Sequence, residues 1–293
     1  MQSNNPIFRR SEEFNRGGAN LYGNQTYAGN GAPQAGYGQT DPSQWSVGTP
    51  GGTGYAPATT SGPMTIDTVV QKTAITLGLV IISAAATWLV TGDITATSVP
   101  SSLVTALTLG SLVAFALSMV NSFKRVISPA LVMAFAVAEG VALGAFSKFI
   151  DAVYNEPGTG HNLVVQAVLG TFAAFAGTLA AYKFFDIKVG QKFRTFVIAA
   201  VFGMVGLSML ELVLGLFGSS FGLFGFGGLG ILTAIAGLVL GVFMLILDFD
   251  FVEQGIANRI PEQESWRAAF AMTVSLVWIY TNLLRLLAIF SDN

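Results

Sequence analysis

Seven apolar runs separated by short polar breaks constrain this chain of 293 residues more than any other feature. We place them at residues 70–90, 102–123, 130–150, 163–183, 195–217, 228–248 and 268–290. A helix that rises about 1.5 Å per residue needs about 20 residues to cross the hydrocarbon core of a bilayer. The strands of a membrane β-barrel would be about half as long and would alternate apolar with polar residues. The sequence therefore predicts an all-α integral membrane protein, a bundle of seven transmembrane helices.

The composition agrees with this class and excludes several others. Charged residues make up 10% of the chain, whereas a soluble domain carries about 25%. The absence of cysteine excludes disulfides and thiolate nucleophiles, and the single histidine, His161, makes a His-based metal site or catalytic triad hard to build. The sequence has no HExxH, GxGxxG or phosphate-loop motif and no basic patch for nucleic acid. We therefore expect no enzymatic activity, no resident cofactor and no nucleic-acid partner.

Residues 1–63 differ from the rest of the chain. They are rich in Gly, Asn, Gln, Tyr and Pro, as in NLYGNQTYAGNGAPQAGYGQ. Such a segment has little apolar surface to offset the entropy cost of ordering. We interpret it as a disordered cytoplasmic tail, and a partner-binding or condensation-prone role stays open. Residues 64–293 then form the transmembrane domain.

The basic residues predict the orientation in the membrane. Twelve of the 14 fall in the tail, at the entry to the first span, or in alternate breaks: Arg9, Arg10, Arg16, Lys72, Lys124, Arg125, Lys183, Lys188, Lys192, Arg194, Arg259 and Arg267. Loops rich in Lys and Arg stay in the cytoplasm. We therefore expect a multi-pass protein of the cell membrane with a cytoplasmic N-terminus and a C-terminus outside.

Ionisable side chains inside membrane spans are costly and mark functional sites. We expect Arg285 to reach the outer interface from the last span. Glu211 is either a hydrogen-bonded structural carboxyl or a functional one. Asp250 closes the sixth span as an interface residue and is the weaker candidate ligand. Asp248 and Glu139 are the stronger candidates for binding an ion or a proton.

Counted from the cytoplasmic start of each span, Glu139 is expected about 14 Å in and Ser275 about 10 Å in, and Asp248 is expected at the cytoplasmic end of the sixth span. A polar cluster of the three in the cytoplasmic half is therefore possible if their helices are neighbours. Carboxyls that lie close together in a bilayer cannot both ionise cheaply, so such a cluster would bind a proton or a hard cation such as Ca²⁺. The alternative is a neutral, hydrogen-bonded carboxyl that holds helices together.

Glycine pairs at GxxxG spacing favour close packing between helices. Gly140 and Gly144 form one pair in the third span, and Gly237 and Gly241 form another in the sixth. They support a compact bundle and indicate no chemistry.

Several segments resemble the Bax inhibitor-1 family, also called the transmembrane Bax-inhibitor-motif family. They are SFKRVISPALVMAFAVAEGVALG, MLILDFDFVEQG, PEQESWRAAF and SLVWIYTNLLRLLAIFSDN. The resemblance covers residues 64–293 and leaves the tail outside the family pattern, and the tail-plus-bundle form is similar to the actinobacterial branch. It implies a seven-helix bundle with a central last helix.

The resemblance also implies a function. Bacterial members include a pH-sensitive calcium leak with one aspartate on the sixth helix and one on the seventh. Asp248 falls on the first position, and Arg125 falls where the family has an arginine that latches onto that aspartate. The second position falls on Ser275 without a gap, or on Asn282 with one, and neither carries a charge. Glu139 could restore the second carboxylate, an inference that is independent of the family pattern.

Two functions follow as expectations. The first is a calcium or other cation leak, gated by protonation around Asp248. The second is a non-transporting regulator of membrane-protein quality control or of a stress response. On the second reading, the tail and the acidic residues Glu253, Glu262 and Glu264 would contact a membrane protease or another membrane protein.

Overall fold

The computed structural model describes residues 62–94, 98–154, 162–185 and 187–291. The predicted disorder of residues 1–63 therefore falls almost wholly outside the described residues, and so does His161.

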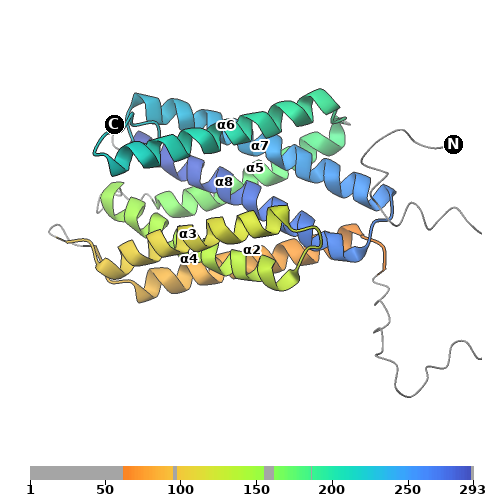
Figure 1. Ribbon diagram of the computed structural model, residues 1–293, viewed down its shortest axis with the longest axis horizontal. Helices are drawn as coiled ribbons and strands as arrows, with labels where there is room; N and C mark the ends of the chain where they lie inside the picture. Colours follow the sequence, from red (N-terminus) through yellow and green to blue (C-terminus); the bar gives the residue numbers. More distant parts are fainter. Residues whose placement is uncertain (1–61, 95–97, 155–161, 186, 292–293) are drawn as a thin grey trace, which may run out of the picture. The chain divides into compact units, whose positions relative to one another are not determined.

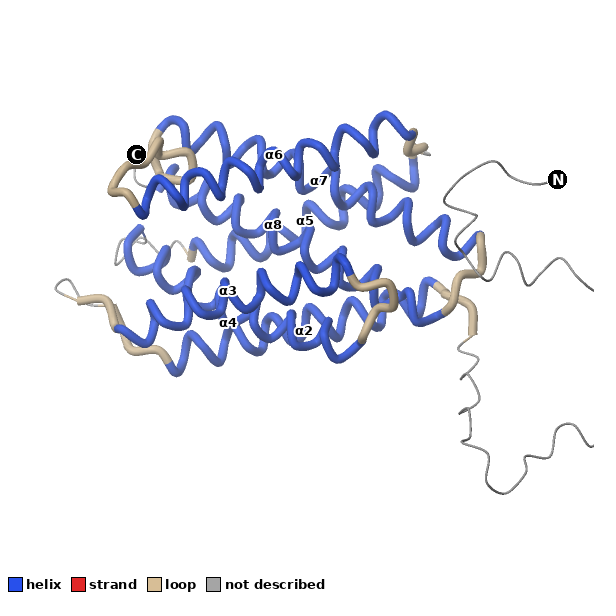
Figure 2. The backbone as a smooth tube through the Cα atoms, viewed as in Figure 1, coloured by secondary structure: helices blue, strands red, loops and turns tan. Residues whose placement is uncertain are grey.

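The described chain is built from seven long helices and one short 3-10 helix, shown in Figures 1 and 2. They are α2 (Ile66–Val90), α3 (Ser101–Phe123), α4 (Pro129–Tyr154), α5 (Leu163–Phe184), α6 (Gln191–Leu216), α7 (Gly228–Ala257), η3 (Glu262–Glu264) and α8 (Ser265–Ser291). All seven long helices are apolar enough to cross a membrane. The seven predicted spans are thus confirmed.

One helix continues well beyond its predicted end. The sixth run was predicted to stop at Asp248, but α7 continues to Ala257. Hydropathy locates only the apolar part of a helix, whereas the backbone hydrogen bonds of α7 continue through the polar residues that follow. As a result Asp248 and Asp250 lie within the helix rather than at its end.

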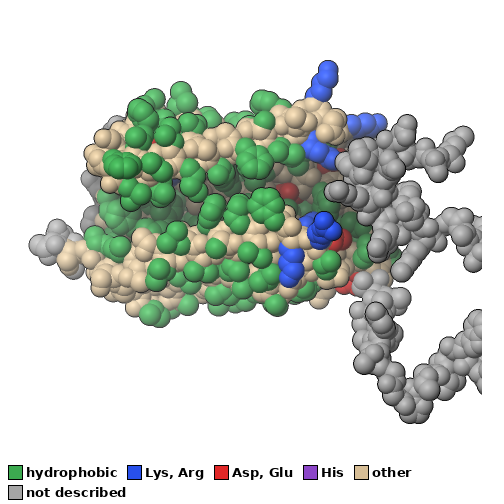
Figure 3. Space-filling view, in the orientation of Figure 1, with side chains coloured by type: hydrophobic (Ala, Val, Ile, Leu, Met, Phe, Trp, Pro, Cys, Tyr) green, Lys and Arg blue, Asp and Glu red, His purple; other side chains and the backbone are tan. Residues whose placement is uncertain are grey.

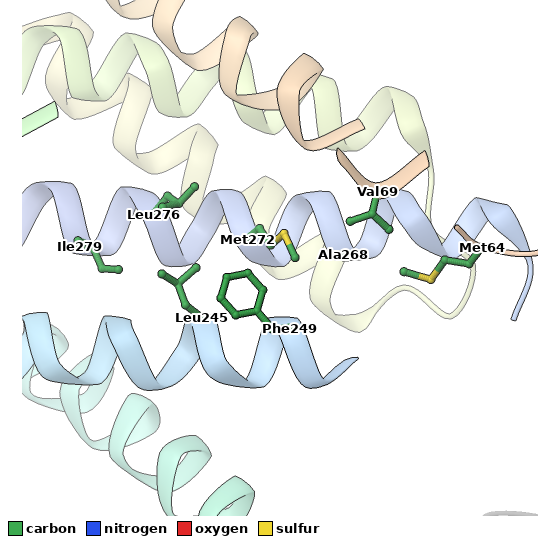
Figure 4. Close-up of a cluster of buried hydrophobic side chains, with 8 residues drawn as sticks. All are labelled: Met64, Val69, Leu245, Phe249, Ala268, Met272, Leu276 and Ile279. Atoms are coloured by element: carbon green, nitrogen blue, oxygen red, sulfur yellow. The ribbon is translucent and has the colours of Figure 1, made fainter. Parts of the chain in front are cut away.

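The last helix is the centre of the bundle, as predicted. Helix α8 packs against α2, α4, α5 and α7, and it is the most buried of the seven helices. Figure 1 shows α8 and α5 running between α6 and α7 on one side and α2, α3 and α4 on the other. Figure 4 shows one core cluster that α8 shares with α2 and α7, comprising Met64, Val69, Leu245, Phe249, Ala268, Met272, Leu276 and Ile279.

The glycines of the two GxxxG pairs lie at close helix contacts. A Cβ atom on Gly140 or Gly144 would collide with the backbone of α2. A Cβ atom on Gly237 or Gly241 would collide with side chains of α8. Lipid tails are as apolar as the helix surfaces, so close van der Waals packing of this kind supplies much of the association between helices in a membrane.

Basic side chains gather at one end of the bundle, which we call the basic end (Figure 3). Nine of the eleven described Lys and Arg residues belong to it: Lys72, Lys124, Arg125, Lys183, Lys188, Lys192, Arg194, Arg259 and Arg267. Lys148 and Arg285 belong to the other half, whose end we call the opposite end. Helices α2, α4, α6 and α8 run from the basic end to the opposite end, and the others run back.

Two helices lie at the edge of the bundle. Helix α3 packs mainly against α4, and α6 packs mainly against α7. Most of the surface of α6 is exposed, and only 11% of its most apolar window is buried. In a bilayer that surface faces lipid.

Candidate ion and proton site

The centre of the candidate site is a hydrogen bond between α7 and α8. The Ser275 hydroxyl donates to Oδ2 of Asp248 over 2.6 Å. Leu245 and Phe249 flank Asp248, and Leu276 follows Ser275, all within the apolar core cluster of Figure 4. Among the residues that the structure describes, no cation forms an ion pair with Asp248. The carboxyl is therefore held in an apolar setting by one neutral donor.

The three predicted cluster residues lie at one depth. Asp248 is nine residues before the end of α7, while Ser275 and Glu139 are each ten residues after the start of α8 and α4. At 1.5 Å per residue, each lies about 14–15 Å from the basic end of its helix.

The structure joins only two of these three residues. Glu139 is half-buried, and within the described part of the chain its carboxyl forms no hydrogen bond or ion pair. No bond links it to Asp248 or to Ser275. Glu139 is therefore a second carboxyl with no counter-charge among the described residues, separate from the Asp248–Ser275 pair.

Arg125 does not reach Asp248. It lies in the connection after α3, exposed, and its carbonyl oxygen accepts a hydrogen bond from Nη2 of Arg267 at 2.9 Å. Arg125 follows the end of α3 at the basic end, whereas Asp248 lies deep in α7. The arginine latch implied by the resemblance is thus not formed in this structure.

Asp250 is part of an ion pair between α6 and α7. Its Oδ2 atom lies 2.8 Å from Nη2 of Arg194 and also accepts a hydrogen bond from Nε2 of Gln254 at 2.7 Å. The Asp250 side chain is 9% exposed, and that of Arg194 is 41% exposed. The sequence shows both charges at the same end of consecutive helices, which is the signal that would have predicted this pair. The structure gives Asp250 a structural partner.

Charged residues in the other half of the bundle bind backbone groups. Nζ of Lys148 donates to the carbonyls of Trp88 (2.9 Å) and Thr91 (2.6 Å) at the end of α2, and it lies 3.2 Å from Asp93. Glu211 accepts hydrogen bonds from the backbone amides of Phe221 and Gly222. The contacts of Glu211 favour the hydrogen-bonded structural alternative. The contacts of Lys148 were not predicted.

The expected exposure of Arg285 at the interface was wrong. Its side chain is buried, and Nη2 lies 3.3–3.5 Å from the carbonyls of Leu223, Gly225 and Gly230. The ring of Phe224 stacks below the guanidinium, 5.4 Å from Cζ to the ring centre. The loop between α6 and α7 and the start of α7 supply carbonyl acceptors for Nη2, whereas the buried Nε has no hydrogen-bond partner among the described residues.

Comparison with known protein families matches residues 5–292 to the family described as Bax inhibitor 1 like. The chain belongs to this family. Comparison with curated proteins found no match. Because the family match begins at residue 5, it includes most of residues 1–63, and the prediction that the tail lies outside the family pattern was wrong.

For a Bax inhibitor 1 like protein, the geometry distinguishes the two positions proposed for a second aspartate. Ser275 faces Asp248, whereas Asn282 lies about two helical turns further along α8. The Asn282 side chain donates to the carbonyl of Trp278 at 2.8 Å and lies against Gly237. The structure therefore joins Ser275, and not Asn282, to Asp248.

The described residues do not assemble a set of metal ligands. In residues 62–94, 98–154, 162–185 and 187–291, no three Asp, Glu or His side chains lie close enough to hold a metal ion. Asp248 supplies one carboxylate and Ser275 one hydroxyl. This arrangement suits the passage of a proton or a cation better than its tight retention, because Ca²⁺ sites that retain the ion gather about six to eight oxygen ligands.

Proposed function

We propose that this Bax inhibitor 1 like protein is a pH-sensitive cation leak, with calcium as the carried ion and Asp248 as the gating carboxyl. The observation that carries the proposal is a carboxyl about 14 Å inside a membrane helix that is bonded to Ser275 and faces no described counter-charge. An ionisable group in this setting is costly to keep for structure alone. We propose that the basic end faces the cytoplasm, following the distribution of Lys and Arg.

The physical basis of the gate is the change of charge on Asp248. Ionised, the carboxylate attracts a cation into the bundle and keeps its bond from Ser275. Protonated, it no longer attracts the cation and packs as a neutral group beside the apolar core cluster. The replacement of the family's second aspartate by Ser275 removes one negative charge from this site. We therefore expect a weaker attraction for divalent cations than a site with two carboxylates has.

The test is flux through the full chain in liposomes loaded with a calcium indicator, measured across the physiological pH range. Calcium flux through the wild type should rise with pH as Asp248 ionises. In Asp248→Asn, which cannot titrate, the flux should no longer depend on pH in this way. Asp67→Asn, at the exposed start of α2, is the matched control and should behave as wild type. No flux at any pH in well-reconstituted protein would overturn the proposal.

Two further variants test whether a second carboxyl takes part in calcium flux. Ser275→Asp restores the charge that the family pattern has at this position, and it should raise calcium flux several-fold. Glu139→Gln should change the pH dependence if that carboxyl takes part, and should leave it unchanged if Asp248 acts alone.

The alternative function is regulation of another membrane protein without transport. The structure gives this reading less support than expected, because the acidic residues assigned to the contact surface have partners within the chain. Glu262 pairs with Lys72 at 2.8 Å, Glu264 pairs with Arg267 at 2.6 Å, and Glu253 accepts from the Tyr182 hydroxyl. Crosslinking in intact membranes would test it, with recovery of a specific partner that is lost on deletion of residues 1–63.

A further inference from the structure

Four exposed cations lie at the edge of the bundle, at its basic end. Lys124 and Arg125 follow the end of α3. Lys183 is in the last turn of α5, and Lys192 is in the first turn of α6. We call these four residues the edge cations. Helices α3 and α6 are the two at the edge of the bundle, so both groups of cations lie where the protein meets the surrounding lipid.

The edge cations differ from other cations at this end in having no described counter-charge. Three of the others pair with acidic side chains: Lys72 with Glu262, Arg267 with Glu264, and Arg194 with Asp250. Among the residues that the structure describes, none of the edge cations forms an ion pair. In the sequence, residues 183–194 contain four basic residues and one acidic residue, Asp186, and residues 122–128 contain two basic residues and no acidic one. Both connections therefore carry a positive net charge.

Large apolar side chains are exposed next to these cations. Phe123, beside Lys124, is 79% exposed. Phe184 and Phe185, which follow Lys183, are 81% and 79% exposed. Surfaces that combine Lys or Arg with Phe at the end of an apolar span bind the membrane interface through buried apolar area and through attraction to anionic lipids. A phospholipid therefore fits these connections better than a water-soluble acidic partner, which would leave the phenylalanines in water.

The charge of the edge cations selects the class of lipid. A headgroup with net negative charge gains from an unpaired cation, and each Lys or Arg near an anionic membrane surface favours such binding about fivefold. A zwitterionic headgroup has no net charge and gains little. In the described part of the chain, the opposite end offers no comparable surface, because its basic residues, Lys148 and Arg285, are buried and bound to backbone carbonyls.

We propose that the edge cations form an interaction surface for phospholipids with net negative charge, in the leaflet at the basic end. The lipid phosphates lie at the edge cations, and the acyl chains pack along the exposed apolar surfaces of α3 and α6. These lipids support α6, a helix with few contacts to the rest of the bundle. The surface is independent of the cation leak proposed above.

The test is electron spin resonance of the full chain in phosphatidylcholine vesicles that contain a trace of spin-labelled phosphatidylglycerol or spin-labelled phosphatidylcholine. Lipids in contact with the protein move slowly, so the slow fraction of each label reports its relative affinity. Wild type should prefer phosphatidylglycerol about threefold at low salt. In about 1 M salt, where the screening length falls to about 3 Å, the preference should disappear.

Two double variants each remove half of the edge cations: Lys124→Gln with Arg125→Gln, and Lys183→Gln with Lys192→Gln. Each should lower the preference, and the quadruple variant should have none. Arg259→Gln is the matched control, because Arg259 is exposed at the same end but lies beside no exposed phenylalanine in the described chain. This control should keep the preference of the wild type.

The slow fraction of labelled phosphatidylcholine measures the lipid-facing surface and should be the same in all variants, so a lost preference is distinguished from a lost fold. Equal slow fractions of the two labels in wild type would overturn the proposal. A preference that survives in the quadruple variant would do the same. An equal loss in Arg259→Gln would also overturn it, because the preference would then follow the total charge of the protein rather than this surface.

Discussion

Charged side chains within the two halves of the bundle have different surroundings. In the half toward the opposite end, Lys148 and Arg285 face backbone carbonyls, and Glu211 faces backbone amides. In the half toward the basic end, Asp250 and Lys72 have counter-charges, but Asp248 has one neutral donor and Glu139 has no described partner. Lys148, Arg285 and Glu211 bind backbone groups at helix ends and in a loop, so their charges have a structural explanation. Asp248 and Glu139 have no such explanation, so they are the candidates for function.

The contrast gives a way to sort ionisable groups inside a membrane protein. A charge that satisfies free carbonyls or amides at helix ends stabilises the fold and should be costly to remove. A carboxyl that lies in an apolar core without a counter-charge stabilises little, because its desolvation opposes folding. Stability and transport should therefore respond to different residues.

The largest stability effect is expected for Lys148→Met. The change leaves the Trp88 and Thr91 carbonyls without their donor in a buried position and should cost about 3 kcal/mol. In detergent the apparent melting temperature should fall by roughly 6–12 °C. Lys183→Met, at an exposed position at the basic end, should change stability by less than about 0.5 kcal/mol. Equal losses in the two variants would mean that the Lys148 contacts do not stabilise α2.

A smaller and local effect is expected for Arg194→Met. This arginine links α6 to α7 through Asp250, and α6 has few other contacts with the bundle. Its partial exposure reduces the loss to about 1–2 kcal/mol. Hydrogen exchange should therefore rise along α6 while α8 stays protected. Lys192→Met, exposed on the same helix turn, should leave α6 protected, and a global rise in exchange would contradict a local role.

The sequence predicts the helices better than it predicts the contacts between them. Apolar runs predict the ends of six helices to within four residues, because each polar break must leave the bilayer, whereas α7 runs nine residues past its predicted end. Depth along the helices also predicted Asp248, Ser275 and Glu139 in one half of the bundle, but it put Asp248 at the end of its span because the apolar run stops nine residues before α7 does. Which of them meet depends on how α4, α7 and α8 are rotated, and a single sequence does not encode that in any local pattern.

The partners of Lys148 and Arg285 were missed for a related reason. Both bind backbone carbonyls, which every residue carries, so no side-chain pattern marks their partners. Asp250 and Arg194 are different, since opposite charges at the same end of consecutive helices are visible in the sequence. A sequence can therefore predict pairs of oppositely charged side chains at known depths, but it does not predict a charged side chain that binds backbone carbonyls.

The variant with the largest expected effect on flux, Asp248→Asn, should have the smallest effect on stability. Asn in place of Asp248 keeps an oxygen that accepts from the Ser275 hydroxyl, and it removes a carboxyl that has no described counter-charge. We expect Asp248→Asn to leave the melting temperature unchanged or slightly raised, within about 0.5 kcal/mol. Ser275→Ala, which removes the donor itself, should cost about 1 kcal/mol. If Asp248→Asn instead destabilised the bundle as much as Lys148→Met, Asp248 would belong with the structural charges, and the assignment of the gate to this carboxyl would be wrong.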